Sequence, residues 1–295
     1  MDVLVHVHAA GVDQGVWHLM TGTPYAMRLA GFGIRAPKNA LLGYDVAGRI
    51  EAVGAQVTEF RPGQEVFGTC RGSFAEYAVA RADRLLPKPG NVTFEQAAVV
   101  PISGFAALQA VREHGGVRSG QRVLIIGAGG GVGTFAVQIA KADGAEVTGV
   151  CSASKAELVR SIGADHVIDY TREDFVDGRN RYDVILDIAG NRSLSELRRA
   201  LTPRGTLVIV GGEDAGKWLG IRRQLRAAAL SPFVRQKLGF FISKERPEDL
   251  EELRKLLEAG TIRPVVDKTF PLEEVPAAIQ YLRDGRARGK IVVVI

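Results

Sequence analysis

The sequence predicts an α/β fold class, in which a doubly wound parallel sheet stands beside a small β-barrel. Three observations lead to this prediction. Short apolar runs separated by turns fill the first 89 residues, strand and helix patterns alternate from residue 93 onwards, and a glycine-rich turn joins one later strand to a helix. With 295 residues, 46% of them hydrophobic, the chain is long enough for two compact domains.

The first part of the chain has the pattern of an all-β domain. Strands are expected at 3–7, 47–53 and 74–79, where apolar residues are bounded by turns that contain glycine and proline. One such turn is Arg61-Pro62-Gly63-Gln64. Short strands at this spacing favour a small barrel.

From Thr93 onwards helices and strands alternate. Thr93 and Gln96 have the capping-box spacing at the start of a helix that runs towards Pro101. Alternation of strand and helix predicts βαβ units and therefore a parallel sheet. The expected strands are 123–126, 147–150, 166–168, 184–186 and 207–210.

The last part of the chain contains a helix and a strand. Pro247 begins a helical pattern with Leu250, Leu253, Leu256 and Leu257 on one face, and Gly260 is expected to end it. Residues 291–295 have the composition of a buried strand.

Composition excludes several classes of protein. Two cysteines, Cys70 and Cys151, are too few for a disulfide framework or a four-cysteine zinc site. No signal-peptide pattern and no apolar run of about 18 residues, the length of a membrane span, are found, so we expect a soluble cytoplasmic protein. Because 33 acidic residues are interspersed with 38 basic ones, the net charge of +5 does not indicate a nucleic-acid partner.

One segment, 217–237, is locally basic, with arginines 222, 223, 226 and 235 alternating with leucines and a valine. It is either the solvated face of an amphipathic helix or a docking surface for an acidic partner or a membrane.

The glycine-rich turn is the strongest single pattern. The strand 123–126 leads through residues 127–133 directly into a helical pattern at 135–141. The register that fits is Ala128-x-Gly130-x-x-Gly133: Ala128 permits the turn, Gly130 lets N–H groups approach a pyrophosphate, and Gly133 lets the helix pack on the strand. We therefore predict a Rossmann domain with Ala128, Gly130, Gly131, Val132 and Gly133 at the cofactor. The alternative is a loop that only tightens a βα turn.

The end of the second strand of this domain predicts which dinucleotide binds. It reads Val150-Cys151-Ser152-Ala153-Ser154-Lys155, without the acidic residue that would bind the ribose hydroxyls of NAD. Ser152 and Lys155 are placed to bind a 2′-phosphate instead, so NADPH is the predicted cofactor. Alternatively, Lys155 is an ordinary exposed lysine at a helix start.

With these residues in hand, the chain resembles the zinc-independent quinone oxidoreductase branch of the medium-chain dehydrogenase/reductase superfamily. The resemblance extends over nearly the whole chain. It rests on 9–13 (AAGVD), 43–48 (GYDVAG), 62–66 (PGQEV), 127–133, 163–170 and the closing 289–292 (GKIV).

The resemblance implies a GroES-like substrate domain made of 1–97 and the returning segment 240–295, with a Rossmann domain at 98–239 between them and the active site in the cleft. It also implies a homodimer. Tyr170 would lie near the adenosine end of the cofactor, Gly211 and Gly212 near the nicotinamide half, and Phe240 and Phe241 along the cleft.

The chain departs from its zinc-dependent relatives at the metal ligands. Asp13 and Tyr44 stand where those relatives have cysteine and histidine, so we expect no metal site. Cys70 is expected to be a small buried residue. His6 and His8 are expected to form an outward-facing row along one strand rather than a metal pair.

The relatives also carry an opening segment before the part that matches Val3 to Val7. Either the start of the sequence is assigned too late, or the strand 3–7 has nothing before it to pair with, which would leave an open barrel edge and weaken stability.

Without zinc to stabilise an alkoxide, alcohol oxidation is disfavoured. Reduction of a quinone or an α,β-unsaturated carbonyl by NADPH needs only a hydrogen bond and a proton at the carbonyl oxygen. Tyr44 is the candidate donor and Asp13 the candidate for positioning substrate or water; alternatively, Tyr44 fills space and Asp13 caps a turn. Other candidate functions are a zinc-free aldehyde, alcohol or enoyl-thioester reductase and an NADPH-binding interaction protein without turnover.

Overall fold

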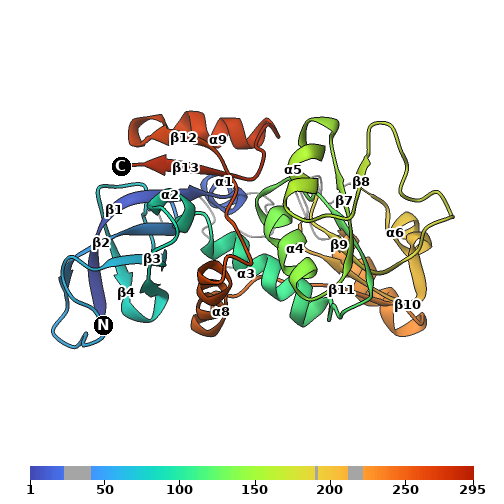
Figure 1. Ribbon diagram of the computed structural model, residues 1–295, viewed down its shortest axis with the longest axis horizontal. Coiled ribbons are helices and arrows are strands. Elements are labelled where there is room, and N and C mark those ends of the chain that lie inside the picture. The colour runs from blue at the N-terminus through green and yellow to red at the C-terminus, as the bar shows by residue number, and fades with distance from the viewer. Residues whose placement is uncertain (23–40, 190–191, 212–221) are drawn as a thin grey trace. The chain divides into compact units, whose positions relative to one another are not determined.

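The computed structural model describes residues 1–22, 41–189, 192–211 and 222–295 (Figure 1). The described residues divide into two compact units. Unit 1 comprises 1–22, 41–105 and 244–295, and unit 2 comprises 106–189, 192–211 and 222–243. The domain limits predicted from the sequence, after residue 97 and before residue 240, remain a prediction.

Unit 1 is built on a seven-stranded sheet with the order β12-β13-β1-β2-β3-β5, in which β4 also pairs with β1. All of these pairs are antiparallel except β12 with β13. The strands are β1 (Asp2–Val12), β2 (Asp45–Val53), β3 (Glu65–Thr69), β4 (Tyr77–Arg81), β5 (Leu85–Pro87), β12 (Val266–Pro271) and β13 (Lys290–Val294).

Apolar alternation along β1 puts one face of this sheet into a core. Val3, Val5 and Val7 are buried and pack with residues of β2 and β3 such as Ile50 and Val66. His6 and His8 lie on the other face, where His6 stacks on Tyr77 and His8 on Phe94. The predicted row of histidines is therefore confirmed.

The expectation of an unpaired first strand is wrong. Val3 and Val5 pair with β2 on one side and with β4 on the other, and residues 9–12 pair with β13. The missing partner comes from later in the chain, because an antiparallel strand can return to a sheet from any sequence distance. β1 is thus an interior strand.

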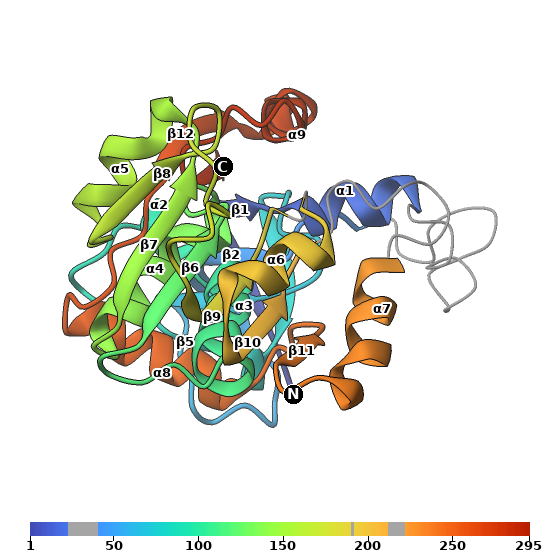
Figure 2. The same cartoon turned by 90° about the vertical axis from the view of Figure 1, so that its right-hand side faces the viewer.

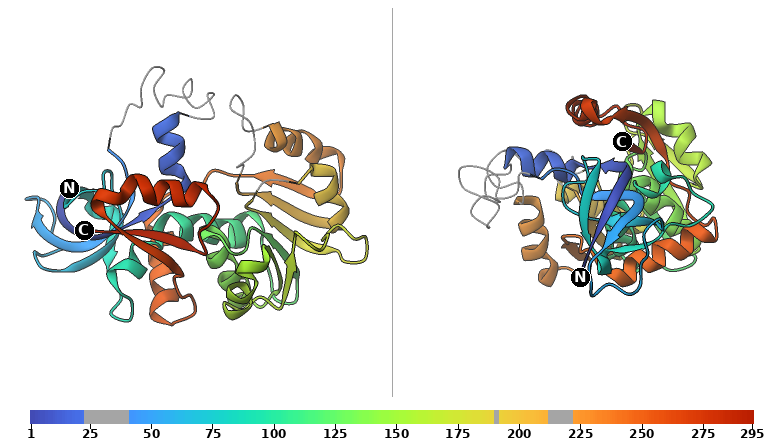
Figure 3. Two further views of the ribbon diagram at one scale, coloured as in Figure 1. Left: turned by 90° about the horizontal axis from the view of Figure 1, so that it is seen from above. Right: turned by 90° about the vertical axis from the view of Figure 1, so that its left-hand side faces the viewer.

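The helices of unit 1 are α1 (Gln14–Thr21), α2 (Phe94–Ala97), the first part of α3 (Pro101–Leu108), α8 (Pro247–Glu258) and α9 (Val275–Arg283). The predicted capping box of Thr93 and Gln96 is present, but α2 ends at Ala97 and Pro101 begins α3. Gly260 follows α8 with φ +67, as a left-handed helix end requires. Figure 3 shows α9 lying along β12 and β13.

Unit 2 contains a fully parallel six-stranded sheet with the order β11-β10-β9-β6-β7-β8. The first strand is central and the order reverses between β6 and β9, as in a doubly wound Rossmann sheet. The strands are β6 (Arg122–Ile126), β7 (Glu146–Cys151), β8 (His166–Asp169), β9 (Tyr182–Asp187), β10 (Leu201–Ile209) and β11 (Lys237–Phe240).

Helices cover both faces of this sheet. They are α4 (Gly131–Ala142), α5 (Ala156–Ser161), α6 (Leu194–Ala200) and α7 (Arg222–Leu230), and a π-helical turn at Gln109–His114 continues α3. Figures 1 and 2 show α4 and α5 on one side of the strands and α6 on the other. Within the described parts of the chain, no helix is long and apolar enough to cross a membrane.

The basic segment 217–237 is described only from residue 222, and Gly212 and 217–221 lie outside the described residues. Its helical part is α7. Leu225 is exposed on this helix, whereas Arg223 points inward and pairs with the buried Asp187. A simple division into an apolar buried face and a basic solvated face therefore does not hold at these two residues.

Candidate active site

The glycine-rich turn follows directly after β6. Gly127 has φ +88, a conformation that favours glycine, and its N–H group and that of Ala128 donate to the carbonyl oxygen of Val150 at 3.0 and 3.1 Å. Ala128 is fully buried with an ordinary backbone conformation. The residue that makes the turn is thus Gly127, one place before the predicted register.

The start of α4 fits a pyrophosphate. Gly130 is the N-cap and offers no side chain to the helix, so the first N–H groups of this 12-residue helix, at Gly131 and Val132, are left for a ligand. A methyl group on Gly130 would meet only the Gly127 oxygen, at 3.5 Å, so the loop has room. On Gly133 it would lie 2.1 Å from that same oxygen, which explains the glycine there.

Lys155 lies against this turn. A methyl group on Gly129 would be 2.9 Å from the Cβ and Cδ atoms of Lys155, so the lysine stem packs over the glycine. Lys155 is half-buried, and the Ser152 and Ser154 hydroxyls lie 3.2 Å apart beside it. The structure therefore brings Ser152 and Lys155 to the glycine-rich turn.

An acidic residue missed in the sequence lies at this edge. Asp169 ends β8 and pairs in register with Cys151 at the end of β7. Hydrogen bonds from the Thr171 backbone and hydroxyl hold its pKa below the usual range. Its carboxylate is thus bound locally. Tyr170, the predicted adenosine contact, follows it, is half exposed, and donates its N–H group to Cys151 at 3.3 Å.

The ends of β9 and β10 complete this edge. Gly211 lies where a methyl group would be 2.0 Å from the Ile188 oxygen, and Ala189 packs against Gly127. Asp187, fully buried at the end of β9, pairs with Arg223 at 2.8 Å. Phe241 stacks on His114 with ring centroids 4.2 Å apart, so it is held within unit 2.

Asp13 and Tyr44, the predicted catalytic residues, belong to unit 1. Asp13 follows β1, and antiparallel pairing brings the start of β2 and the start of β13 to the same edge of the sheet. Lys290 of β13 donates to Asp13 at 2.5 Å and to Asp45 of β2 at 3.2 Å. Gly11 makes room for Asp45, because a methyl group there would lie 2.7 Å from its Oδ2.

These three side chains form a buried ion triad. The Lys290 and Asp45 side chains are 3% and 0% exposed, and that of Asp13 is 10% exposed. Burial raises the pKa of Asp45 well above its usual value and the charge of Asp13 adds to this, while Lys290 opposes it. Burial alone lowers the pKa of Lys290, but the two carboxylates outweigh it and the net shift is upward. Lys290 therefore stays cationic.

Two carboxylate oxygens of the triad, one from Asp45 and one from Asp13, accept no hydrogen bond from Lys290. Oδ1 of Asp45 accepts from the N–H group of Ile102 at 2.8 Å, which ties the triad to the start of α3. Oδ2 of Asp13 is buried and accepts no hydrogen bond from a described residue. Asp13 is thus held by Lys290 through Oδ1, and a side-chain hydrogen bond with Asp13 also contributes to the raised pKa of Asp45.

Tyr44 precedes Asp45 and is half-buried. Burial raises its pKa, with Arg71 acting against this and Glu245 adding to it, so the hydroxyl keeps its proton at neutral pH. Burial also raises the pKa of the Cys70 thiol to about 12, and its side chain is nearly inaccessible. The prediction of a small buried cysteine is confirmed.

The sequence reasoning missed Lys290 and Asp45 as site residues. Both residues belong to motifs on which the resemblance rests, and both begin a strand that pairs with β1. Their place in these motifs was the sequence signal that could have identified them. Among the described residues, no group of three or more histidine, cysteine, aspartate or glutamate side chains could hold a metal ion.

Two family models match the chain. The model described as alcohol dehydrogenase GroES-like domain matches residues 1–90, and the one described as zinc-binding dehydrogenase matches residues 162–293.

Proteins with similar sequences and structures are oxidoreductases by name. A mouse protein named NAD(P)H oxidoreductase RTN4IP1, mitochondrial, is 35% identical over 99% of this chain and 81% of its own. The 2-methylene-furan-3-one reductase of Solanum lycopersicum is 32% identical over 88% of this chain and 64% of its own. The solved quinone oxidoreductase of Coxiella burnetii covers 100% of this chain and 90% of its own with a TM-score of 0.83 and 26% identity.

These likenesses agree with the geometry of the glycine-rich turn and with the strand order of unit 2. The chain therefore belongs to the quinone oxidoreductase-like branch of the medium-chain dehydrogenase/reductase superfamily and is an oxidoreductase with a Rossmann-type site for a nicotinamide cofactor.

Proposed function

We propose that this chain is an NADPH-dependent, zinc-independent reductase of quinones or α,β-unsaturated carbonyl compounds. The observation that carries the proposal is the Lys290 ammonium between Asp13 and Asp45. This buried cation occupies the place beside Asp13 where zinc-dependent relatives hold their metal. A reaction that needs no Lewis acid suits such a site.

The cofactor would be held by unit 2. The pyrophosphate would bind the N–H groups at the start of α4, and Ser152 and Lys155 would bind the 2′-phosphate, next to Tyr170. Gly211 and Phe241 would line the nicotinamide half. When bound, NADPH supplies the hydride.

The residues of unit 1 would manage the charge that develops on the substrate. Hydride addition to an enone or quinone leaves negative charge on the carbonyl oxygen. The protonated Tyr44 hydroxyl donates a hydrogen bond to that oxygen. Solvent delivers the proton, and Asp13, whose orientation Lys290 fixes, would position the substrate.

The name of the tomato relative supports the enone class, because a 2-methylene-furan-3-one carries a carbon–carbon double bond conjugated to a carbonyl. The test is an NADPH-oxidation screen over 1,4-quinones, enones, aldehydes and enoyl thioesters, each with and without chelator. We expect turnover with quinones or enones that chelator does not change. Turnover with enoyl thioesters or aldehydes alone would assign the other reductase class, and tight NADPH binding without turnover would indicate an interaction protein.

Cofactor choice has its own test. Removing the Lys155 ammonium removes one charge-assisted contact, so Lys155→Ala should weaken NADPH binding by about 1–2 kcal/mol and leave NADH binding unchanged. Fluorescence titration of both cofactors measures this, with Lys268→Ala in unit 1 as the control for loss of one positive charge. Equal affinities for NADPH and NADH in the unaltered protein would show that no 2′-phosphate pocket exists.

Assembly and location are further parts of the proposal. We propose a homodimer, which sedimentation of the purified protein would show by a mass twice that of the 31.7 kDa chain. A cytoplasmic location remains our prediction although the mouse relative is named as mitochondrial, and cell fractionation distinguishes the two.

A further inference from the structure

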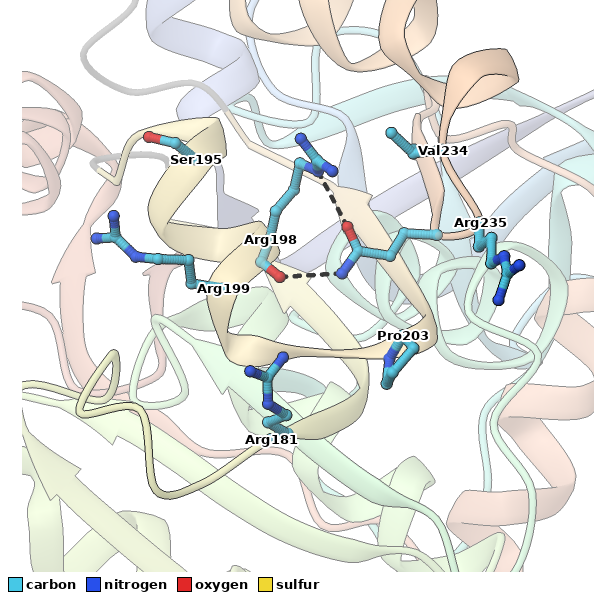
Figure 4. Close-up of a pocket in the computed structure, with 8 residues that line it drawn as sticks. Arg181, Ser195, Arg198, Arg199, Pro203, Val234 and Arg235 are labelled. Carbon is cyan, nitrogen blue, oxygen red and sulfur yellow. Dashed lines mark hydrogen bonds between the residues drawn. The ribbon is translucent and has the colours of Figure 1, made fainter.

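Unit 2 has a pocket of about 600 Å³ that is open to solvent and whose lining is dominated by arginine, with Arg181, Arg199 and Arg235 exposed. Figure 4 shows it surrounded by Arg181, Arg198, Arg199 and Arg235, with Ser195, Pro203, Val234 and Gln236 completing the lining. None of the described residues that line it is acidic. Since arginine is charged at all accessible pH values, four positive charges surround this cavity.

The cavity lies at the edge of the sheet opposite the cofactor-binding edge. Arg181 immediately precedes β9, Pro203 lies near the start of β10, and Arg235 and Gln236 immediately precede β11. All three strands run parallel to β6, whose carboxyl end carries the glycine-rich turn. A strand of six residues spans roughly 20 Å, so the cavity is separate from the nucleotide site.

The arginines are not all explained by the structure around them. Arg198 is held by Gln236, which accepts from its Nε at 3.0 Å and donates back to its carbonyl oxygen at 2.9 Å. Arg181 donates to the carbonyl oxygen of Leu201 at 3.2 Å. The side chains of Arg199 and Arg235 form no hydrogen bond or ion pair with any residue in the described part of the chain.

One structural role accounts for part of the cluster. Arg198 and Arg199 lie in the last turn of α6, where positive charge offsets the negative end of the helix dipole. This does not explain Arg181 and Arg235, which come from two other elements and add charge to the same cavity. Solvent screens the repulsion between the exposed arginines, but an anionic ligand in the pocket would meet four positive charges and no negative one.

We propose that this cavity binds a small molecule with at least two phosphate groups, of the nucleoside polyphosphate class. Guanidinium groups bind phosphate in two-pronged geometry, and the volume lies within the usual range for small-molecule sites. Figure 4 shows the Arg199 and Arg235 side chains on opposite sides of the pocket, extending in opposite directions. One phosphate group carries a charge of about −2, so it would balance only part of the four positive charges. Pro203 and Val234 offer apolar surface to the organic part of the ligand.

The test is calorimetric titration of tripolyphosphate and of ATP into the full chain, with and without saturating NADPH. We expect both ligands to bind in the presence of NADPH, and Arg199→Gln/Arg235→Gln to weaken both by about tenfold or more, the effect of losing charge-assisted contacts. The control variant, Arg61→Gln/Arg118→Gln, removes two exposed arginines outside the cavity and should bind as the unaltered protein does. Thermal melting of both variants checks that they fold.

Three outcomes would overturn the proposal. These are no binding of either ligand at millimolar concentration, equal weakening in both double variants, or complete displacement by NADPH, which would place the ligand in the cofactor site. Binding of anionic vesicles that depends on Arg199 and Arg235, without binding of tripolyphosphate, would replace it with a membrane surface. NADPH oxidation is expected to be unchanged in the cavity variant, so this result and that of the activity screen are independent.

Discussion

At the scale of single residues, Lys290 determines the electrostatics of unit 1. Its ammonium is the positive group that the hydrogen bonds place between two carboxylates inside the protein. Such a triad is stable only while all three groups are present, because each buried charge has lost its hydration and is stabilised by the opposite charges beside it.

Lys290→Met should therefore destabilise the protein by about 3–5 kcal/mol, the usual cost of leaving buried charges without their partner. Urea unfolding measures this. Arg49→Met is the matched control: it removes one positive charge from the exposed Arg49–Glu65 pair and should cost at most about 1 kcal/mol. Equal effects of the two substitutions would mean that the triad is open to water in solution.

The Tyr44 hydroxyl offers the most direct test of the proposed chemistry. If it stabilises the developing oxyanion, Tyr44→Phe should lower kcat/KM about 10²-fold, the scale seen for single oxyanion donors, with little change in NADPH binding. Tyr77→Phe, an exposed tyrosine on β4, serves as the control. Unchanged kcat/KM in Tyr44→Phe would show that Tyr44 only fills space.

At the scale of elements, the turn between β6 and α4 contains glycines that are there for two different reasons. Gly133 is required by packing, since the helix passes directly over the Gly127 carbonyl oxygen. Gly130 has space beside it and an ordinary φ of −96, so we propose that its lack of a side chain serves the approach of a ligand.

These roles predict different outcomes for the same substitution. Gly133→Ala should destabilise the protein by about 1–3 kcal/mol, as overpacking does, whereas Gly130→Ala should change stability by no more than about 0.5 kcal/mol. Gly130→Ala should nevertheless weaken NADPH binding. Urea unfolding and NADPH fluorescence titration separate the two effects, and a Gly130→Ala protein that binds NADPH normally would contradict the assignment of the pyrophosphate site.

At the scale of the whole molecule, the strands that pair with β1 come from distant parts of the chain. β4 and β13 pair with β1 at opposite ends, and Lys290 arrives with β13. The pairing of β13 with β1 therefore also assembles the ion triad.

That assembly also predicts the metal content of the whole protein. A zinc ion at Asp13 would have to displace a buried ammonium 2.5 Å away, so we expect purified protein to contain no stoichiometric zinc and chelator to leave turnover unchanged. Elemental analysis measures this, and a value near one zinc per chain would refute the zinc-independent assignment.

Local features of this protein could be predicted from its sequence. The strands expected at 123–126, 147–150, 166–168 and 184–186, the capping box at Thr93, the helix from Pro247 and the glycine-rich turn follow from periodicity and from backbone preferences that act over a few residues. The strands β3, β5, β11 and β12 were not expected, and the strand expected at 74–79 is β4 at Tyr77–Arg81. It also identified the turn as a dinucleotide site, because strand, glycines and helix are adjacent in the chain.

Contacts between distant residues could be seen only in the folded chain. Lys290 reaches Asp13 and Asp45 because of strand pairing, and Arg223 reaches Asp187 because of the packing of α7. Four arginines from three segments of the chain line one pocket because the parallel strands begin at one edge. Contacts between residues far apart in sequence leave no periodic signal, since they depend on the register of the sheet rather than on neighbouring residues. For the same reason the unpaired β1 expected from the sequence became an interior strand.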